Sequence, residues 1–551
     1  MKKIVAILLA LLMGMMLAAC GGGTGQKTPP PGGELDEETE LTGQLNIYVN
    51  FQGYGKDWTE ALKKEFGAIH PKLEINIVPD ISNATGTNDI EKGTGLFDLV
   101  FSGGPLSRYG IPDSSGQTKL LDLTDVANAI PDGESRSAAE KMAVNNVNDI
   151  FMINNKYYAL PYMSTVGGIH YNKVVLDNVF GEGEWELPVT TREFIDFLGQ
   201  ISEIESKKPA ETRAYGITIS PELAYWGYAT DTWWAQYEGY EDFSNFSYAE
   251  YYDENGVKQV AKDAASFRKA MDPLGREKAF IELSSILAAP NINPVSVDIE
   301  FVDHQKQFAT GKYQQNTNPS AFITCGDWYE LETRSAVMEA GQPVRFMRTP
   351  VISSIVEELE DKNMTDETLA KVIRAIDGGA RSKDEVMQTA NVSLSENDFA
   401  RLYEARRMVT YQTGNHAVGI PASARNVRAA KEFLVFMASD FGQQIFAKAT
   451  GGLVPPYDYD ITSDESIVLS EYVKSVHYAY YDNFSFLPVA LDIKAPLVIY
   501  GGLDTYGNLS NMDDQFGNNH VEPVSYNQSI VNELAKKYET VAKFISPTVR
   551  G

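Results

Sequence analysis

The order of strands and helices near the start of the folded part constrains this chain more than any other feature. Residues 44–49 alternate apolar side chains with other residues, at the period of a β-strand. A helix is expected from Asp57, which caps it with Glu60 at the third position, and its apolar face repeats at helical spacing: Trp58, Leu62, Phe66 and Ile69. Residues 74–78 and 96–101 are two further strands. This strand–helix–strand order predicts an α/β protein with a mostly parallel sheet.

Four later segments extend the pattern. Residues 168–173 predict a strand, and Thr190 is expected to cap a helix whose apolar face is Phe194, Phe197, Leu198 and Ile201. Residues 426–446 predict one long helix with four inward residues: Ala430, Phe433, Met437 and Phe441. Residues 355–411 are helical in pattern and highly charged, which predicts a surface insertion.

The loops that follow the first and third strands contain candidate ligand-binding residues. Gln52 and Tyr54 lie in a glycine-rich loop, and Ser102 precedes a Gly-Gly pair. Ligands in open α/β sheets bind at the carboxyl ends of strands, where glycine lets backbone N–H groups approach them. The alternative is that these residues only stabilise their own turns.

The amino terminus has the pattern of an export signal. Lys2 and Lys3 precede an apolar run from Ile4 to Leu17, which is too short to span a membrane, and the run ends at Leu-Ala-Ala-Cys20. This end resembles a bacterial lipobox, which implies cleavage before Cys20 and acylation of its thiol and new amino terminus. The alternative is an ordinary signal peptide. With the anchor in place, the protein is expected on the outer face of the cell membrane, on a flexible glycine- and proline-rich tether.

Composition narrows the class of protein further. The 551 residues are too many for a single core, so more than one lobe is expected. The formal net charge of −28 argues against nucleic acid and anionic lipid as partners. Only two cysteines occur, so acylation of Cys20 leaves Cys325 without a disulfide partner, and Cys325 is expected to be a small buried residue.

Clusters of aromatic residues suit a sugar, because rings cover its C–H face while amides and carboxylates bind its hydroxyls. Tyr225 and Trp226 are adjacent, and Trp233 and Trp234 follow in what reads as an irregular segment. Trp226, Trp233 and Trp234 are therefore candidates, although adjacent residues of an extended segment point in opposite directions. Tyr506 is a further candidate. The alternative for each of these aromatic residues is that it packs in a hydrophobic core, which is the interpretation favoured for Trp58.

Taken in order, four segments resemble the solute-binding proteins of bacterial ABC importers, in particular those that bind maltodextrins and other oligosaccharides. The segments are IYVNFQGYGKDWTEALKKEFGAIHPKLEINIV, YALPYMSTVGGIHYNKVVLDN with LPVTTREFIDFL, FATGKYQQNTNPSAFITCGDWYE, and GNHAVGIPASARNVRAAKEFLVFMASDFGQQIFAKATGGLVP. The resemblance implies two α/β lobes joined by hinge strands with a ligand cleft between them, and an ABC permease as partner. It also implies that Trp328 stacks on the ligand, with Asp327 beside it as an acceptor.

The expected division of the chain follows the same resemblance, and a monomer is expected. The segments are a signal peptide (1–19), a tether (20–42), the first lobe (43–160), the second lobe (161–345), a return to the first lobe (346–450, with the 355–411 insertion) and a second-lobe end (451–551).

Catalytic motifs are absent from the sequence. It has no HExxH or GxSxG motif, and its six histidines lack metal-ligand spacing. We therefore expect no metal, no cofactor and no enzyme activity, but capture of an oligosaccharide by hinge closure and its delivery to a permease. The alternatives are a carbohydrate-active lipoprotein enzyme with two carboxylates across a cleft, or the same fold binding a non-sugar solute or acting as a sensor.

Overall fold

The computed structural model describes residues 40–144, 147–219, 225–296, 299–411, 413–481, 486–503, 512–517 and 519–545. The predicted signal peptide, Cys20, nearly all of the tether and Tyr506 lie outside these residues.

The first lobe is built on a sheet whose strand order in the described residues is β2-β1-β3-β14-β6. Its strands are β1 (Gly43–Asn50), β2 (Leu73–Asp80), β3 (Leu99–Ser102), β6 (Leu160–Pro161) and β14 (Ala417–Gly419). β1 pairs in parallel with β2 and β3, whereas β14 is antiparallel to both of its neighbours. The parallel part of this sheet is the part that the strand–helix–strand pattern predicts.

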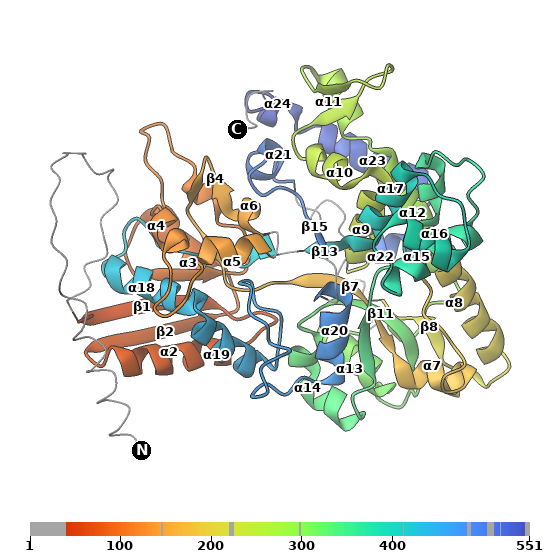
Figure 1. Cartoon of the computed structure of the whole chain (residues 1–551), viewed down its shortest axis with the longest axis horizontal. Helices are drawn as coiled ribbons and strands as arrows, with labels where there is room; N and C mark the ends of the chain where they lie inside the picture. Colours follow the sequence, from red (N-terminus) through yellow and green to blue (C-terminus); the bar gives the residue numbers. More distant parts are fainter. Residues whose placement is uncertain are drawn as a thin grey trace. The chain divides into compact units, whose positions relative to one another are not determined.

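Helices cover this sheet, and two of them, α2 and α19, lie side by side along it (Figure 1). The helices are α2 (Asp57–Ile69), α3 (Ala84–Lys92), α4 (Thr124–Asn128), α5 (Ala138–Val144), α6 (Asn148–Phe151), α18 (Val427–Ala438) and α19 (Asp440–Thr450). A short 3-10 helix, η1 (Ser107–Gly110), and a hairpin of β4 (Met152–Ile153) and β5 (Lys156–Tyr157) complete the lobe.

The second lobe has a mixed sheet with the order β15-β13-β7-β11-β8 among the described strands, and β12 also pairs with β7. These are β7 (Val166–Asn172), β8 (Tyr215–Ile217), β11 (Ser320–Gly326), β12 (Val344–Met347), β13 (Met408–Tyr411) and β15 (Leu487–Val489). β7 is antiparallel to β11, β12 and β13. The predicted α/β class and the two-lobed architecture are therefore confirmed.

The helices of the second lobe surround its sheet (Figure 1). They are α7 (Lys173–Phe180), α8 (Thr191–Glu205), α9 (Gly227–Glu238), α10 (Tyr240–Phe246), α11 (Ala264–Ala270), α12 (Leu274–Ile286), α13 (Phe301–Thr310), α14 (Tyr329–Glu339), α15 (Asp366–Asp377), α16 (Lys383–Ala390), α17 (Glu396–Arg407), α20 (Glu471–Tyr481), α21 (Pro496–Ile499), α22 (Met512–Gly517), α23 (Pro523–Ala535) and α24 (Tyr538–Val541). Three 3-10 helices, η2 (Ala210–Thr212), η4 (Ser353–Glu358) and η5 (Thr413–Asn415), and a hairpin of β9 (Glu250–Tyr252) and β10 (Lys258–Val260) join them.

The charged segment 355–411 differs from the surface insertion that its composition predicts. α15 buries an apolar stripe in the second-lobe core: Leu369, Val372, Ile373 and Ile376. β12 and β13, which flank this segment, both belong to the second sheet. The chain therefore returns to the first sheet only at β14, and not at residue 346, because an amphipathic helix needs a core to cover and the second lobe provides it.

Some of the predicted helix caps and helix ends agree with the structure, and others do not. Thr190 and Asn426 cap their helices as expected, each accepting a backbone N–H three residues on. α2, by contrast, begins without a side-chain cap at Lys56. The predicted 426–446 helix is divided at Ser439, whose extended backbone ends α18 and whose hydroxyl caps α19. This division turns Phe441 outward, to 50% exposure.

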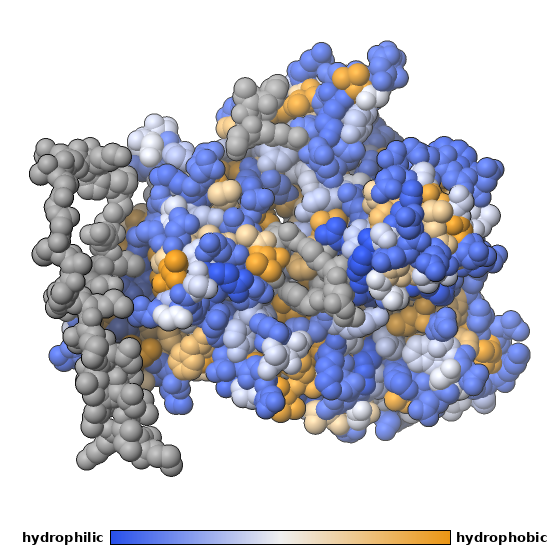
Figure 2. Space-filling view, in the orientation of Figure 1, coloured by the Kyte–Doolittle hydropathy of each residue, from blue (hydrophilic) through white to orange (hydrophobic). Residues whose placement is uncertain are grey.

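The chain crosses between the lobes in the described residues at three places: between β6 and β7, between β13 and β14, and between α19 and α20. The first two crossings are tied together, because the hydroxyls of Ser164 and Tyr411 lie 3.0 Å apart. In the view of Figure 2 the surface is mostly hydrophilic, and hydrophobic residues gather only in small groups. No helix in the part of the chain described by the structure is long and apolar enough to cross a membrane.

Candidate functional site between the two lobes

The hydroxyl group of Tyr54 joins three separate segments. Tyr54 lies in the loop after β1, in the first lobe, and only 7% of its surface is exposed. Its hydroxyl donates to Asp327 Oδ1, in the second lobe, at 2.8 Å. It also lies 2.8 Å from Thr165 Oγ1, in the first crossing. This atom therefore connects both lobes and the hinge.

Trp328 packs against the same contact. It follows β11 directly and ends up 8% exposed at the start of α14. Its indole meets the ring of Tyr54 edge-on at 5.7 Å between centroids, and the rings of Tyr225 and Tyr228 at 6.3 Å.

Glycine makes this packing possible on two sides. Gly53 has a positive φ of 76°, and a Cβ there would lie 3.3 Å from Trp328 Cγ. A Cβ on Gly326 would lie 2.0 Å from the same indole. Since no larger residue fits at Gly326 without moving the indole, this glycine fixes where the ring of Trp328 lies.

Burial changes the protonation of the acidic groups here. Desolvation raises the pKa of Asp327 to about 8, although the hydrogen bond from Tyr54 acts in the opposite direction. Desolvation also raises the pKa of Glu332 to about 7. The nearby His416, whose ring meets that of Tyr54 at 5.4 Å, has its pKa lowered by burial to about 4. At neutral pH this contact therefore favours neutral groups.

These shifts predict that the unliganded protein opens as the pH rises. The closed arrangement favours protonated Asp327, so its stabilising contribution is complete below about pH 4 and is lost as the pH rises to about 8. His416, whose pKa is lowered by burial to about 4, is neutral over the pH range in which Asp327 loses its proton near pH 8. Small-angle scattering between pH 6.5 and 8.5 should show an increasing radius of gyration. Asp327→Asn should flatten this dependence, and an unchanged slope would contradict the assignment.

Two loop residues predicted to bind ligand lie at the strand ends but differ in exposure. Gln52 is exposed beside the Tyr54 loop. Ser102 is 1% exposed; its Oγ accepts from the backbone N–H of Gly104 at 3.1 Å, and its carbonyl accepts from the hydroxyl of Tyr162 at 3.1 Å. In this structure the side chain of Ser102 thus stabilises its own turn.

The structure places Trp226, Trp233 and Trp234 in the second-lobe core and not around Tyr54. The segment is a helix and not irregular, and every residue of α9 from Gly227 to Tyr237 is buried. Trp233 donates its indole N–H to the carbonyl of Pro350 at 3.0 Å. Trp234 packs between two phenylalanines, at 4.8 Å from each ring. A helix that is buried on all sides lies in the centre of its lobe, which explains the clustering of tryptophan there.

Other aromatic and polar residues complete the site or the cores. Trp58, read from its helical spacing as a core residue, is 1% exposed and stacks on Tyr162 at 5.5 Å. Tyr228, Thr165 and His416 were not singled out in the sequence, yet they surround Tyr54 and Trp328. Tyr228 lies close to the predicted Trp226, which is the one signal for it, and no local pattern marks Thr165 or His416.

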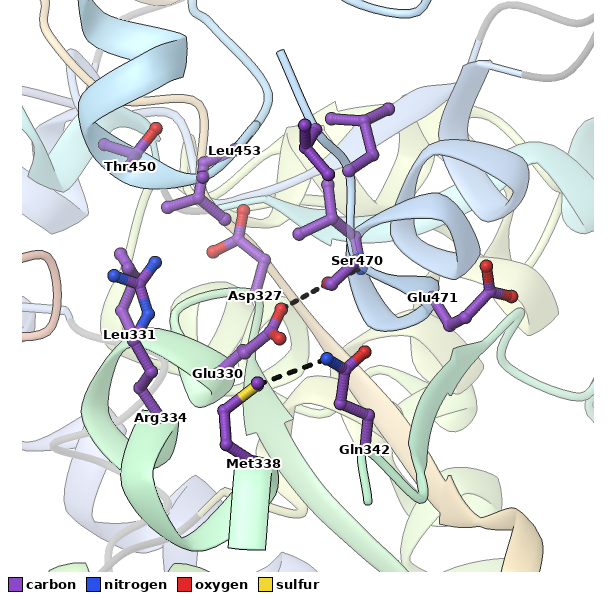
Figure 3. Close-up of a pocket in the computed structure, with 14 residues that line it drawn as sticks. Asp327, Glu330, Leu331, Arg334, Met338, Gln342, Thr450, Leu453, Ser470 and Glu471 are labelled. Carbon is purple, nitrogen blue, oxygen red and sulfur yellow. Dashed lines mark hydrogen bonds between the residues drawn. The ribbon is translucent and has the colours of Figure 1, made fainter. Parts of the chain in front are cut away.

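Two pockets lie where segments of both lobes meet. The first has a volume of about 330 Å³ and lies between α14, the Thr450–Leu453 segment and the start of α20. Figure 3 shows Asp327, Glu330 and Arg334 at this pocket, where Glu330 accepts a hydrogen bond from Ser470 at 2.5 Å.

The second pocket, of about 440 Å³, is lined by residues from α6, α10 and the segment after β15. That segment bridges the lobes. Ser107 donates to the carbonyl of Ile493 at 2.9 Å, Lys494 to the carbonyl of Asp149 at 2.5 Å, and Tyr248 to Asp492 at 2.5 Å. Both volumes suit a small solute. No group of three or more metal-ligating side chains is found among the residues of known placement.

Comparison with known proteins agrees with this architecture. Residues 48–288 match the model of the bacterial extracellular solute-binding protein family. That family is defined by binding and not by catalysis. Comparison with curated protein sequences gives no match.

Solved structures extend the likeness to most of the chain. The GacH receptor of Streptomyces glaucescens GLA.O, solved unliganded and with acarbose, is 15% identical over 91% of this chain and 99% of its own, with a TM-score of 0.53. A chitin oligosaccharide binding protein is 13% identical over 91% and 100%, with a TM-score of 0.52. A protein from work on xylan utilization by Caldanaerobius polysaccharolyticus is 16% identical over 89% and 99%, with a TM-score of 0.54. The chain has the two-lobed fold of bacterial extracellular solute-binding proteins, and its residues 48–288 match the model of that family.

Proposed function

We propose that this protein captures a carbohydrate, an oligosaccharide, between its two lobes and delivers it to the permease of an ABC importer. The observation that carries the proposal is the contact of Tyr54, from one lobe, with Asp327 and Trp328, from the other. An indole covers the C–H face of a sugar, while a carboxyl group and phenolic hydroxyls bind its hydroxyls. The similar structures include proteins described with acarbose and with chitin oligosaccharide.

The proposed mechanism is hinge closure. Open and closed states exchange, and a sugar that contacts both lobes stabilises the closed state by its additional contacts. Tyr54 and Trp328 come from opposite lobes, so we expect them to separate when the lobes open, and a sugar bound between them would favour the closed state. The closed form would then bind the permease as a monomer.

The predicted site residues fall into two groups: those at the contact between the lobes and those that support a lobe. Tyr54, Asp327 and Trp328 are the proposed central contacts, with Gln52 at the rim. Ser102, Trp226, Trp233 and Trp234, also predicted from the sequence, are proposed only as supports for the lobes that present the site, because their side chains serve a turn or a core. Tyr506 remains a prediction outside the described residues.

We also propose that the chain is anchored to the outside of the cell membrane through acylated Cys20. The support is the sequence Leu-Ala-Ala-Cys after an apolar run. Cys20→Ser should release the protein into the medium and abolish its labelling by a radioactive fatty acid. Cys325→Ser, which changes a buried cysteine, is the matched control and should stay labelled and cell-bound. Equal labelling of the Cys20 variant would exclude the anchor.

A thermal-shift screen over neutral oligosaccharides tests the binding proposal. A ligand at about 100 times its Kd adds roughly 2.7 kcal/mol to the stability of the folded state. The same mixtures are assayed for released reducing sugar, which distinguishes a binding protein from a carbohydrate-active enzyme. No shift with any glycan would overturn the carbohydrate proposal, and steady release of reducing sugar would favour the enzyme.

A further inference from the structure

Three buried oxygen atoms beneath Trp328 accept no hydrogen bond from any residue that the structure describes. They are Asp327 Oδ2, Glu332 Oε2 and Gln305 Oε1. The amide oxygen of Gln305 is an acceptor, and the two carboxyl oxygens become acceptors when their groups ionise. A buried acceptor without a donor costs free energy, so the arrangement calls for an occupant that is rich in donors and positively charged.

The three side chains belong to one cluster. Gln305 donates its amide N–H to Cys325 Sγ at 3.3 Å, and Cys325 precedes Asp327 by two residues. Gln305 and Trp328 lie close enough to Glu332 to lower the pKa of its carboxyl group, and both Glu332 and Asp327 lie close enough to Cys325 to raise the pKa of its thiol. We call Gln305, Asp327 and Glu332 the acceptor cluster.

No cation of the described residues forms an ion pair with this cluster. Neither Asp327 nor Glu332 takes part in any ion pair found among the described residues, and Arg334, at the same pocket as Asp327, forms none with it. Some other largely buried carboxylates are paired with cations, Asp377 with Arg348 and Arg406 and Glu205 with Lys208, whereas the buried Asp398 accepts from backbone N–H groups. The carboxyl groups of Asp327 and Glu332 thus have no cation among the described residues and, at one oxygen each, no hydrogen-bond donor either.

Aromatic rings border the acceptor cluster. Trp328 has the rings of Tyr54, Tyr225 and Tyr228 around it, within 6.3 Å between centroids. A carboxyl group combined with the faces of tryptophan and tyrosine is the arrangement that binds organic cations, because the ring quadrupole and the carboxylate both attract positive charge.

We propose that the carbohydrate bound by this protein carries a protonated amine, as in an amino sugar, and that its ammonium group donates to the acceptor cluster beneath Trp328. The inference rests on the proposed function. An ammonium group has three donors and no acceptor, which matches three acceptor oxygens. The raised pKa of Asp327 and of Glu332 agrees, since both groups lack a positive charge nearby and would regain ionisation on binding one.

The test uses chemically matched ligands in isothermal titration calorimetry with the full mature protein. β-1,4-linked oligomers of glucose, of glucosamine and of N-acetylglucosamine differ only at C2, and glucose, galactose and their 2-amino forms extend the set to monosaccharides. At pH 7 and low salt the amine form should bind roughly tenfold or more tighter than its hydroxyl and N-acetyl counterparts, as hydrogen bonds to a charged group predict. The advantage should shrink as salt is added.

Two variants test whether the tighter binding of the amine form depends on Asp327. Asp327→Asn keeps the shape of the side chain and removes its charge, so the ratio of amine to hydroxyl affinity should fall to about threefold or less. Glu339→Gln makes the same kind of change at an exposed position at the end of α14, the helix that follows Asp327, and should keep the ratio.

The outcomes separate the two proposals. Binding of neutral sugars with no amine advantage in any matched set overturns this inference and leaves the carbohydrate proposal standing. An amine advantage that survives in Asp327→Asn overturns the assignment to the acceptor cluster. Binding of none of these sugars overturns the proposed function itself.

Discussion

Trp328→Ala is expected to weaken carbohydrate binding about 30-fold or more while leaving the protein folded. An aromatic ring at the centre of a contact contributes roughly 2 kcal/mol or more when truncated, and about 1.4 kcal/mol corresponds to tenfold in Kd. Trp328 is central because it touches Tyr54 of the opposite lobe and two tyrosines of its own. The measurement is calorimetric titration with the best ligand of the screen, together with the melting temperature.

Trp226→Phe is the matched control. Trp226 is fully buried in the second-lobe core, so its truncation should lower the melting temperature and change Kd by less than about threefold. Trp328→Tyr keeps an aromatic face and should recover part of the affinity. Unchanged binding by a folded Trp328→Ala protein would refute the stacking role.

Asp377→Ala is expected to lower the free energy of unfolding by about 3–5 kcal/mol, the usual cost of breaking a buried ion pair. Asp377 ends α15 and accepts from Arg406 through both oxygens, at 2.8 and 2.6 Å, and from Arg348 at 2.8 Å. The side chains of both arginines are less than 10% exposed, so removing the carboxylate leaves two buried charges uncompensated. Urea unfolding at pH 7 measures the loss.

Glu367→Ala provides the comparison on the same helix. Glu367 pairs with Lys371 at the surface, where solvent screens the interaction, so its removal should barely move the urea midpoint. If the two variants were equally stable, Asp377 would not hold α15 to the lobe.

The sequence predicts best where a single side-chain period decides the structure. β1 and α2 follow from apolar residues repeating every second position or at helical spacing, and Trp58 is a core residue for the same reason. The lengths of the elements are less secure, because one residue such as Ser439 can divide a helix by a change of backbone angle.

The residues that surround the binding site are harder to predict from the sequence than the strands and helices are. Trp328 is identified by a short motif at a strand end, but its neighbours come from segments more than a hundred residues apart, as the contact of Tyr54 with Thr165 shows. Trp233 and Trp234 show the reverse case. Their aromatic richness suits a sugar, yet it belongs to a helix enclosed on all sides, and composition alone does not distinguish the two.

The position of β14 has a consequence for when the first lobe can form. β14 lies between β3 and β6 in the first sheet, although it is only three residues long and comes after residue 416. During synthesis from the amino terminus, the ribosome must therefore make about three quarters of the polypeptide before that sheet can close. Until then the edges of β3 and β6 lack their partner strand, and such unpaired edges are where one chain can pair with another.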